Sequence, residues 1–385
     1  MSSCDIDLSG QAAQANSATR ALRYPIEVRA ANEADNEGLL ALTRVTPMAG
    51  TISIRIDRDP DFFALLRLRG EGKVFVAVRE REVVGCISAA LRTSYVSGIP
   101  ESVAYIGDMK VHPRFSGTRI ALRLIRALEG YLRAIGNDLC FSVVADGNHR
   151  AMPLFEGRLG IPRWADLGRF IVDELMPSPL KARAEGYRTE GAVSGDLPAI
   201  TKLLDGVYRL RQFAPRLSEE ELEHSFSGSS EEPFSRHFVA RISGRVVATL
   251  SLQDTREVKQ NVLLDAPVAM RGALGLLRIA SAALPGLCVP RLGDSLRLLC
   301  ARHIACEDGH LSALKCLLAM ARAEAFRRRF TFLVIGLHER DPLRSLVQGI
   351  PGFTFSSRAL ATSLTRPDRL ESLARGIPFE DFALV

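Results

Sequence analysis

Between Val111 and Leu122 the chain has the residues and spacing that bind phosphate groups. The segment reads Val-His-Pro-Arg-Phe-Ser-Gly-Thr-Arg-Ile-Ala-Leu. We expect a strand that ends at Val111, a tight loop around Ser116 and Gly117, and a helix that begins near Ile120. The first N–H groups of a helix have no partner within it, and the helix dipole favours an anion beside them. The segment therefore predicts a pyrophosphate site.

A strand that contains one acid leads into this loop. Residues Ala104–Val111 alternate as a half-buried strand does, with Asp108 inside it. Pro113 ends the strand because it has no N–H to donate. The helix that follows is expected over Ile120–Ile135, with its leucines on one face.

A second polar turn follows the next strand. The apolar run Cys140–Ala145 predicts that strand, and Asp146, Gly147 and Asn148 predict a turn after it. A helix is expected through Leu154 to Leu159, with Gly160 closing it. Together with the first loop, this segment resembles the motifs of the GNAT superfamily, the acetyl-CoA-dependent N-acetyltransferases.

The resemblance implies an α/β fold, a mixed and mostly antiparallel sheet flanked by helices. It also implies acetyl-CoA or another acyl-CoA as co-substrate, no metal, and a pantetheine arm held between two strands that splay apart. By this resemblance the cofactor contacts fall on Met109, Lys110, Val111, Ser116, Gly117, Thr118, Arg119, Ile120, Ala121, Asn148, Ala151 and Phe155.

The chain departs from the GNAT pattern at three of these positions. Ser116 stands where the family has Gln or Arg, and Arg119 replaces a glycine that lets the backbone approach the phosphates closely. Arg119 adds a cation beside the same site. Phe155 falls where many members have a Tyr that protonates the leaving thiolate, and Phe has no proton to donate.

Two residues of the first strand are candidates for the acid–base chemistry. Asp108 is the acid within the strand and is the first candidate for the base that takes the proton of an amine. Its alternative role is that of a solvated or salt-bridged strand acid. Tyr105, on the opposite face of the strand, is the second candidate.

Internal repeats predict two copies of one fold. Phe75-Val76-Ala77 recurs as Phe238-Val239-Ala240, and Gly160-Ile161-Pro162 recurs as Gly349-Ile350-Pro351. We expect a mobile tail over residues 1–23, a first domain over 24–180 and a second over 186–385. The second domain has an apolar insertion at about 261–292.

The second copy has a less favourable loop for a phosphate. Its loop contains Glu307 and Asp308 beside Gly309, and negative charges repel a pyrophosphate. We therefore expect the first copy to hold the cofactor and the second to have lost it.

Composition restricts the other classes of function. The net charge of +6 over 385 residues suits a polyanionic ligand, but no basic stripe with interleaved aromatics indicates nucleic-acid binding. Seven cysteines without a C-x-x-C pair favour neither disulfides nor zinc, so a reducing cytoplasm is the expected location. The apolar stretch Asn261–Pro290 is interrupted by charges and prolines, and we expect no membrane span.

The predicted function is transfer of an acetyl group from acetyl-CoA to an amine of a small molecule or peptide. One alternative is a long-chain N-acyltransferase whose insertion lines an acyl pocket. The other is a non-catalytic sensor or interaction protein that binds CoA, which the residues at 116, 119 and 155 favour. The sequence leaves the acceptor and the oligomeric state open.

Overall fold

The structure is a computed structural model, and it describes residues 25–48, 52–149, 151–157, 160–180, 182, 186–227, 235–256, 258–281 and 286–385. The tail expected over residues 1–23 lies outside these ranges.

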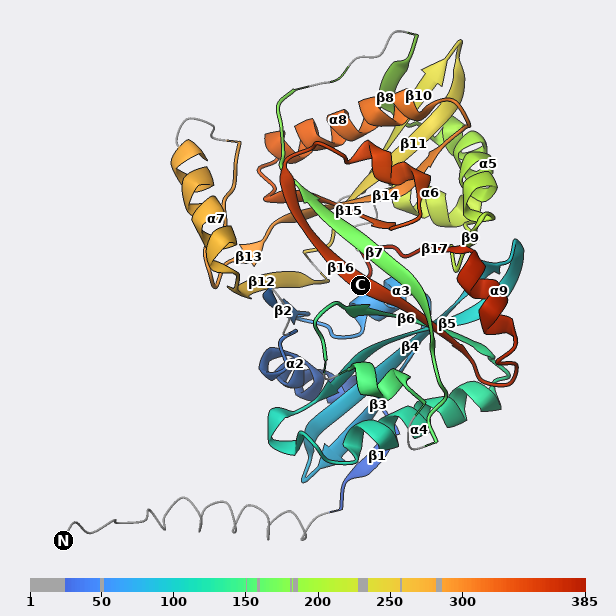
Figure 1. The fold of residues 1–385 in the computed structure, drawn as a ribbon, viewed down its shortest axis with the longest axis vertical. Coiled ribbons are helices and arrows are strands. Elements are labelled where there is room, and N and C mark those ends of the chain that lie inside the picture. Colours follow the sequence, from blue (N-terminus) through green and yellow to red (C-terminus); the bar gives the residue numbers. More distant parts are fainter. Residues whose placement is uncertain are drawn as a thin grey trace, which may run out of the picture.

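A single mixed sheet extends through the described part of the chain (Figure 1). Its strand order is β1-β3-β4-β5-β6-β16-β7-β15-β14-β11-β10-β8. The first half consists of β1 (Glu27–Ala30), β3 (Glu71–Arg79), β4 (Glu82–Val96), β5 (Ile99–Val111) and β6 (Leu139–Ala145). The second half consists of β8 (Arg188–Gly191), β10 (Ser235–Ile242), β11 (Arg245–Asp254), β14 (Leu298–Cys306) and β15 (Phe332–His338). Between them lie β7 (Ala165–Leu175) and β16 (Gly352–Ser363).

The two halves of the sheet have matching strand directions. In the described sheet β5 and β6 are parallel, β14 and β15 are parallel, and the other neighbours are antiparallel. The expected fold, a mixed and mostly antiparallel sheet flanked by helices, is confirmed.

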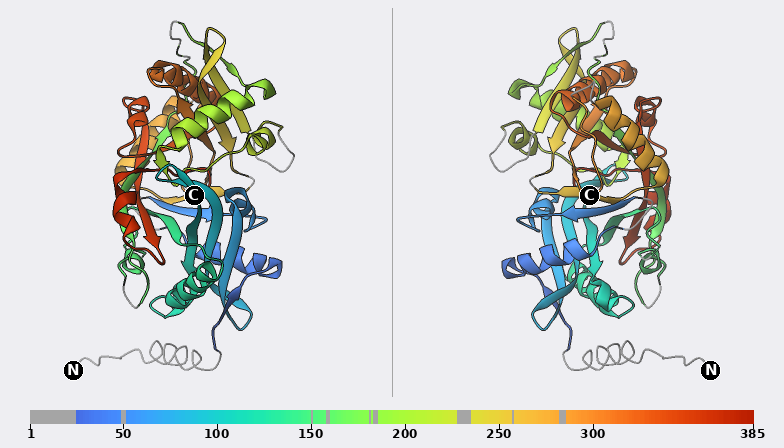
Figure 2. Two further views of the ribbon diagram at one scale, coloured as in Figure 1. Left: turned by 90° about the vertical axis from the view of Figure 1, so that its right-hand side faces the viewer. Right: turned by 90° about the vertical axis from the view of Figure 1, so that its left-hand side faces the viewer.

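The strands that close each half are exchanged between them. β7 follows the first half in sequence, yet it pairs with β15 of the second half and with β16. β16 comes from the end of the chain and pairs along β6, from Leu139 to Ala145. One sheet therefore contains strands from both sides of the domain boundary that the sequence predicts between residues 180 and 186. Figure 2 shows β7 and β16 along one side of the molecule.

Helices cover both faces of each half because the strands beneath them are apolar on both sides. In β3, Phe75 and Ala77 pack against α4 (Ile120–Ala134), whereas Val74 and Val76 pack against α2 (Asn36–Val45). α4 buries Leu124, Leu128 and Leu132, which recur every four residues on one face. This confirms the helix predicted over Ile120–Ile135.

The second half repeats this arrangement. α8 (Leu311–Arg327) packs on Phe238 and Ala240 of β10. α5 (Leu197–Tyr208) packs on Val239, which lies between these two residues in the strand and faces the other side of the sheet. The remaining short helices are η1 (Glu33–Asp35), α3 (Ala64–Arg69), η2 (Pro113–Phe115), η3 (Met152–Phe155), η4 (Ser194–Asp196), α6 (Glu219–Ser227), η5 (Pro342–Leu346) and α9 (Arg369–Arg375). None of the described helices is long and apolar enough to cross a bilayer.

The predicted insertion forms a strand and a helix that reach across to the first half. β12 (Gln260–Asp265) lies between β13 (Ser295–Leu296) and β2 (Ser53–Asp57), and α7 (Val268–Ser281) follows β12. In the first half, by contrast, β4 and β5 are joined directly by a tight turn. The insertion thus stands in place of that hairpin and ties the second half to β2.

The helix expected through Leu154 to Leu159 is shorter than predicted. The structure forms one 3₁₀ turn there, Met152–Phe155, and Gly157 then adopts a positive φ of 77°. Residues 158–159 lie outside the described ranges. Pro153 in the first turn lacks an N–H, and Gly157 turns the chain towards Arg163.

Candidate active site

A bulge at Asp108 directs the end of β5 away from β6. Asp108 has a φ of 53°, and the register between β4 and β5 shifts beside it, between Cys86 and Ser88. Within the described strands, the parallel pairing of β5 with β6 stops at Tyr105 and Phe141. A bulge bends its strand and interrupts the ladder. The last six residues of β5 therefore diverge from β6, as the resemblance predicted for a pantetheine site.

The Asp108 carboxylate is held by an arginine and a serine. Arg58, directly after β2, reaches both of its oxygens at 2.9 and 2.7 Å, and the Ser88 hydroxyl donates to Oδ2 at 2.9 Å. Burial raises the pKa of Asp108, but the charges of Arg58 and Lys110 and these hydrogen bonds outweigh it and hold the pKa below its usual value. The carboxylate is thus ionised and already accepts three hydrogen bonds. This geometry matches the salt-bridged alternative better than the catalytic base.

Tyr105 lies at the point where the two strands separate. Its ring stacks beneath the Arg69 guanidinium, 3.4 Å from ring centroid to Cζ, and meets Phe141 edge-on. Burial raises the pKa of the hydroxyl well above its usual value, although Arg69 acts in the opposite sense. The hydroxyl is therefore protonated at neutral pH.

The predicted phosphate loop is exposed and leads directly into α4. Ser116, Gly117, Thr118 and Arg119 are exposed, while the next residue, Ile120, is buried in the core. Arg119 is the N-cap of α4, and its side chain makes no capping hydrogen bond. Gly117 has a φ of 78°, which glycine adopts without strain. The loop therefore leaves the start of α4 open to an anion.

The second motif lies at the same edge of the sheet, because β5 and β6 are parallel and both end there. Asn148 accepts a hydrogen bond from the Ala151 N–H at 3.2 Å and so shapes the turn. Phe155 packs edge-on against Trp164, with ring centroids 5.1 Å apart. The other cofactor candidates of β5, Met109 and Val111, direct their side chains into the core that α4 covers.

The second half has a similar bulge with different side chains. In β14 the positive φ falls at His303, at 48°, and in the described strands β14 pairs with β15 from Leu298 to Cys300. Ser251 Oγ lies 2.8 Å from Nδ1 of His303. The following loop holds Glu307, which forms an ion pair with Arg245. An acid thus occupies the loop that corresponds to Ser116–Arg119.

Sequence reasoning missed a group of buried charges at the end of the chain. The Arg69 guanidinium donates to Glu380 at 3.0 and 3.2 Å, and Arg302 donates to Asp381 at 2.6 Å. Lys259 donates to the main-chain oxygen of Val385 at 2.5 Å. Figure 1 shows this end of the chain in the middle of the molecule. No local pattern marks these acids, because their partners lie far away in the sequence.

Comparison with known proteins agrees with this geometry. Residues 42–161 match the model of the Acetyltransferase (GNAT) family. No curated protein matches the chain significantly.

Solved structures resemble the chain over most of its length. A GCN5-related N-acetyltransferase from Anabaena variabilis is 11% identical over 89% of this chain and 73% of its own, with a TM-score of 0.51. An N-myristoyltransferase from Saccharomyces cerevisiae, solved with bound myristoyl-CoA, is 13% identical over 88% of this chain and 82% of its own, with a TM-score of 0.59.

A third similar structure is the GCN5-related glucosamine N-acetyltransferase region of a fungal multi-domain β-N-acetylglucosaminidase. It is 14% identical over 88% of this chain and 38% of its own, with a TM-score of 0.59. At these identities the likeness establishes the fold. The chain therefore has a GNAT-like fold, and the match to the GNAT family model covers residues 42–161.

Proposed function

We propose that the protein is an N-acyltransferase that moves an acyl group, acetyl in the first instance, from acyl-CoA to an amine. The observation that supports this most directly is the bulge at Asp108. It separates β5 from β6 just before an exposed loop and a helix whose N-cap residue, Arg119, makes no side-chain capping hydrogen bond. Such a strand edge offers main-chain groups to an extended arm, and the helix N-terminus offers N–H groups to its phosphates.

Each part of acyl-CoA has a place in this proposal. The pyrophosphate lies at Ser116–Ala121, where Arg119 adds a cation in place of the missing glycine. The pantetheine runs along Met109–Val111, and an N–H of this strand polarises the thioester carbonyl. The motif at Asn148–Phe155 supports the far side of the cofactor.

The proposed reaction is direct transfer. The amine nitrogen attacks the thioester carbon and the carbon–sulfur bond breaks, which forms an amide and the CoA thiolate. The proton that the amine loses passes to water, and the thiolate takes up a proton from water. Phe155 has no hydroxyl, so the thiolate leaves without an acid at that position; a thiol pKa of about 8.5 makes it a workable leaving group. Asp108 acts here as a positioning residue that fixes Arg58 and the bulge. Tyr105, the second candidate for the base, is protonated at neutral pH, so the proposal gives it no proton transfer.

The proposal includes two copies of the fold, of which the first holds the cofactor. The matching strand directions, the paired bulges at Asp108 and His303, and the equivalent helices α4 and α8 support this division. Glu307 in the second loop opposes a phosphate there. The exchange of β7 and β16 joins the copies into one sheet.

Single substitutions in the two loops test where the cofactor lies. Calorimetry with acetyl-CoA is performed on the natural protein, on Ser116→Asp and on Asp308→Ser, and release of free thiol is followed with a panel of amines. We expect acetyl-CoA to bind the natural protein and to bind Ser116→Asp about tenfold or more weakly, because the substitution adds a negative charge to the first loop. Asp308→Ser is the matched control and leaves affinity unchanged.

Three outcomes contradict the proposal. Calorimetry is repeated with palmitoyl-CoA, and the proposal that the protein is an acyltransferase is excluded if neither acetyl-CoA nor palmitoyl-CoA binds. Binding that responds to Asp308→Ser and not to Ser116→Asp moves the cofactor to the second half. Binding without thiol release for any amine supports a CoA-binding sensor instead.

The long-chain alternative has one observation in its favour. The insertion does line an apolar pocket, through Leu263, Met270 and Leu274. The same pocket contains the carboxyl group of Glu174, which is unfavourable beside an acyl chain. Acetyl transfer therefore remains the preferred reaction.

A further inference from the structure

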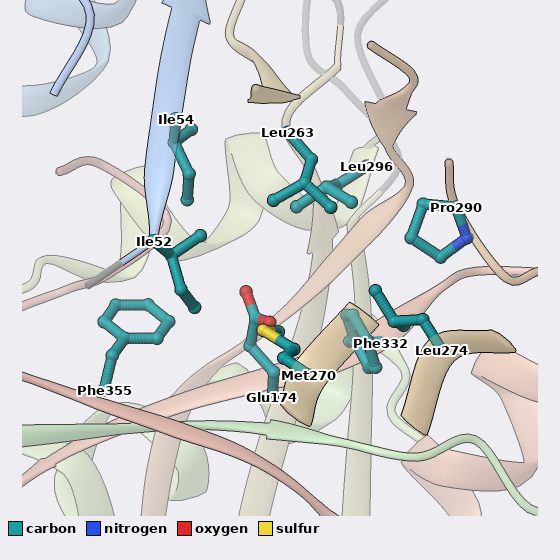
Figure 3. A pocket seen from close by; sticks show the side chains of 10 residues that line it. All are labelled: Ile52, Ile54, Glu174, Leu263, Met270, Leu274, Pro290, Leu296, Phe332 and Phe355. Carbon is teal, nitrogen blue, oxygen red and sulfur yellow. The ribbon is translucent and has the colours of Figure 1, made fainter. Parts of the chain in front are cut away.

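The pocket beneath the insertion brings together elements that are far apart in sequence. Ile54 of β2 comes from the first half, Leu263 of β12 and Leu274 of α7 come from the insertion, and Glu174 and Phe355 come from the central strands (Figure 3). Nine of the ten lining residues are apolar. An apolar lining with a convergent polar group is also typical of the sites that bind small molecules.

Glu174 is the polar group, and it points into the pocket (Figure 3). Its main chain is fixed in the sheet, opposite Val334 of β15 and Phe353 of β16. The residue is 4% exposed, and no described residue forms a hydrogen bond or an ion pair with its carboxyl group. Burial alone raises the pKa of this group to about 7.

An isolated carboxylate in apolar surroundings is costly, and the described residues that line the pocket do not offset that cost. The other lining side chains are hydrocarbon, thioether or aromatic and donate no hydrogen bonds. A cationic hydrogen-bond donor from outside would pair with the carboxylate. An ammonium group is such a donor, and its charge-assisted bond to a carboxylate is among the strong ones.

The size of the pocket indicates how such a ligand enters. Its cavity volume is about 10 Å³, which is room for about one water molecule or one ammonium group. A longer apolar tail has to displace the wall formed by Met270 and Leu274 of α7. That helix leaves Val268, Leu276 and Ile279 70–75% exposed, so it is held through its inner face, by Met270 and Leu274.

We propose that this pocket is a binding site for an apolar primary amine, whose ammonium group pairs with the Glu174 carboxylate while its tail lies under α7. The site is separate from the one at Asp108. Ile54 of β2 and Arg58, which directly follows β2, lie four residues apart, about 13 Å along an extended chain. The proposal therefore does not depend on acyl transfer.

Binding of n-hexylamine, measured by calorimetry at pH 8 without CoA, tests this site. Hexan-1-ol and hexanoate are the neutral and anionic comparison ligands. Glu174→Gln removes the charge at nearly constant size, and Asp265→Asn is the matched control, because Asp265 is an exposed acid on β12. Leu274→Trp enlarges a side chain of the pocket wall and leaves Glu174 itself unchanged.

We expect hexylamine to bind the natural protein and Asp265→Asn, and to bind Glu174→Gln and Leu274→Trp about tenfold or more weakly. The two comparison ligands bind the natural protein about tenfold or more weakly than the amine. Equal binding of hexylamine to Glu174→Gln, equal binding of hexan-1-ol, or no binding up to about 10 mM amine would each overturn the proposal.

Discussion

Asp108 and His303 have the same backbone conformation at equivalent places in the two halves of the sheet. Their φ angles are 53° and 48°, and each hydrogen-bonds a serine of the neighbouring antiparallel strand, Ser88 at 2.9 Å and Ser251 at 2.8 Å. In each strand the bulge comes after three residues that pair with a parallel neighbour, β5 with β6 and β14 with β15. The conformation is uncommon for residues other than glycine, and its recurrence supports the proposal that one fold occurs twice.

The side chains at these two bulges give the halves different electrostatics. Asp108 carries a charge that Arg58 neutralises, whereas burial and the charge of Arg302 lower the pKa of His303 well below its usual value. One bulge is thus an ion pair and the other is a neutral, hydrogen-bonded histidine. This difference leads to separate predictions for the two halves.

The first prediction concerns the ion pair of Asp108 with Arg58. Both side chains are about 10% exposed, so Asp108→Asn leaves a buried guanidinium without its counter-charge. We expect the free energy of unfolding to fall by about 3–5 kcal/mol in urea titrations. The control is Asp59→Asn, whose partner Arg44 is half exposed, and it costs about 1 kcal/mol or less. A variant Asp108→Asn that keeps its stability but loses turnover would instead identify Asp108 as the base.

The local features of this site were predictable from sequence. The strand, loop and helix around Ser116 follow from Pro113, Gly117 and the four-residue spacing of leucines in α4, all of which act within a few residues. The α/β class was predictable from such local patterns, and the repeat of Phe75 at Phe238 could be read directly from the sequence.

Long-range contacts were not predictable in this way. Arg58 lies 50 residues from Asp108, and Arg69 lies 311 residues from Glu380, so neither pair has a local signature. The exchange of β7 and β16 depends on strand pairing that any apolar strand would satisfy. Glu174 also gave no signal, since an acid within an apolar run commonly faces solvent.

The second prediction concerns the pH dependence that Glu174 causes. Its pKa rises from 4.5 to about 7 on folding, because burial disfavours the charged form. The folded protein therefore binds a proton that the unfolded chain has lost between these pH values, and stability falls as pH rises from 4.5 to 7. We expect Glu174→Gln to gain up to about 3 kcal/mol over the natural protein at pH 8 and nothing at pH 4.5. Urea unfolding at the two pH values measures this, and an equal difference at both would contradict it.

The third prediction concerns the buried histidines His237 and His303, whose stacked rings are 5.1 Å apart. Burial, followed by the charge of Arg302, lowers the pKa of His237 from 6.5 to about 3. Below pH 6.5 His237 binds a proton in the unfolded chain but not in the folded protein, so the free energy of unfolding falls as the pH falls. Between pH 7 and pH 5 we expect His237→Leu to lose about 2 kcal/mol less stability than the natural protein.

The control for this prediction is Val239→Ala, which changes the same strand, β10, without removing a titratable group. Its pH dependence should equal that of the natural protein. If His237→Leu shows the natural pH dependence as well, the histidine is not held neutral and the packing of this core needs another explanation.

The last prediction concerns the two loop glycines, Gly117 and Gly309, whose φ angles are 78° and 82°. A Cβ at either position would meet nothing within 4 Å, so Gly→Val strains the backbone without a clash. A positive φ costs a side chain about 1–2 kcal/mol, and the loop relieves that cost by changing shape. We expect Gly117→Val to weaken acetyl-CoA binding about tenfold, because the N–H groups at the start of α4 lose their alignment. Gly309→Val imposes the same strain on the second loop and should leave affinity unchanged. Calorimetry on the two variants compares the loops at equal backbone cost, and a larger loss for Gly309→Val would place the phosphates in the second half.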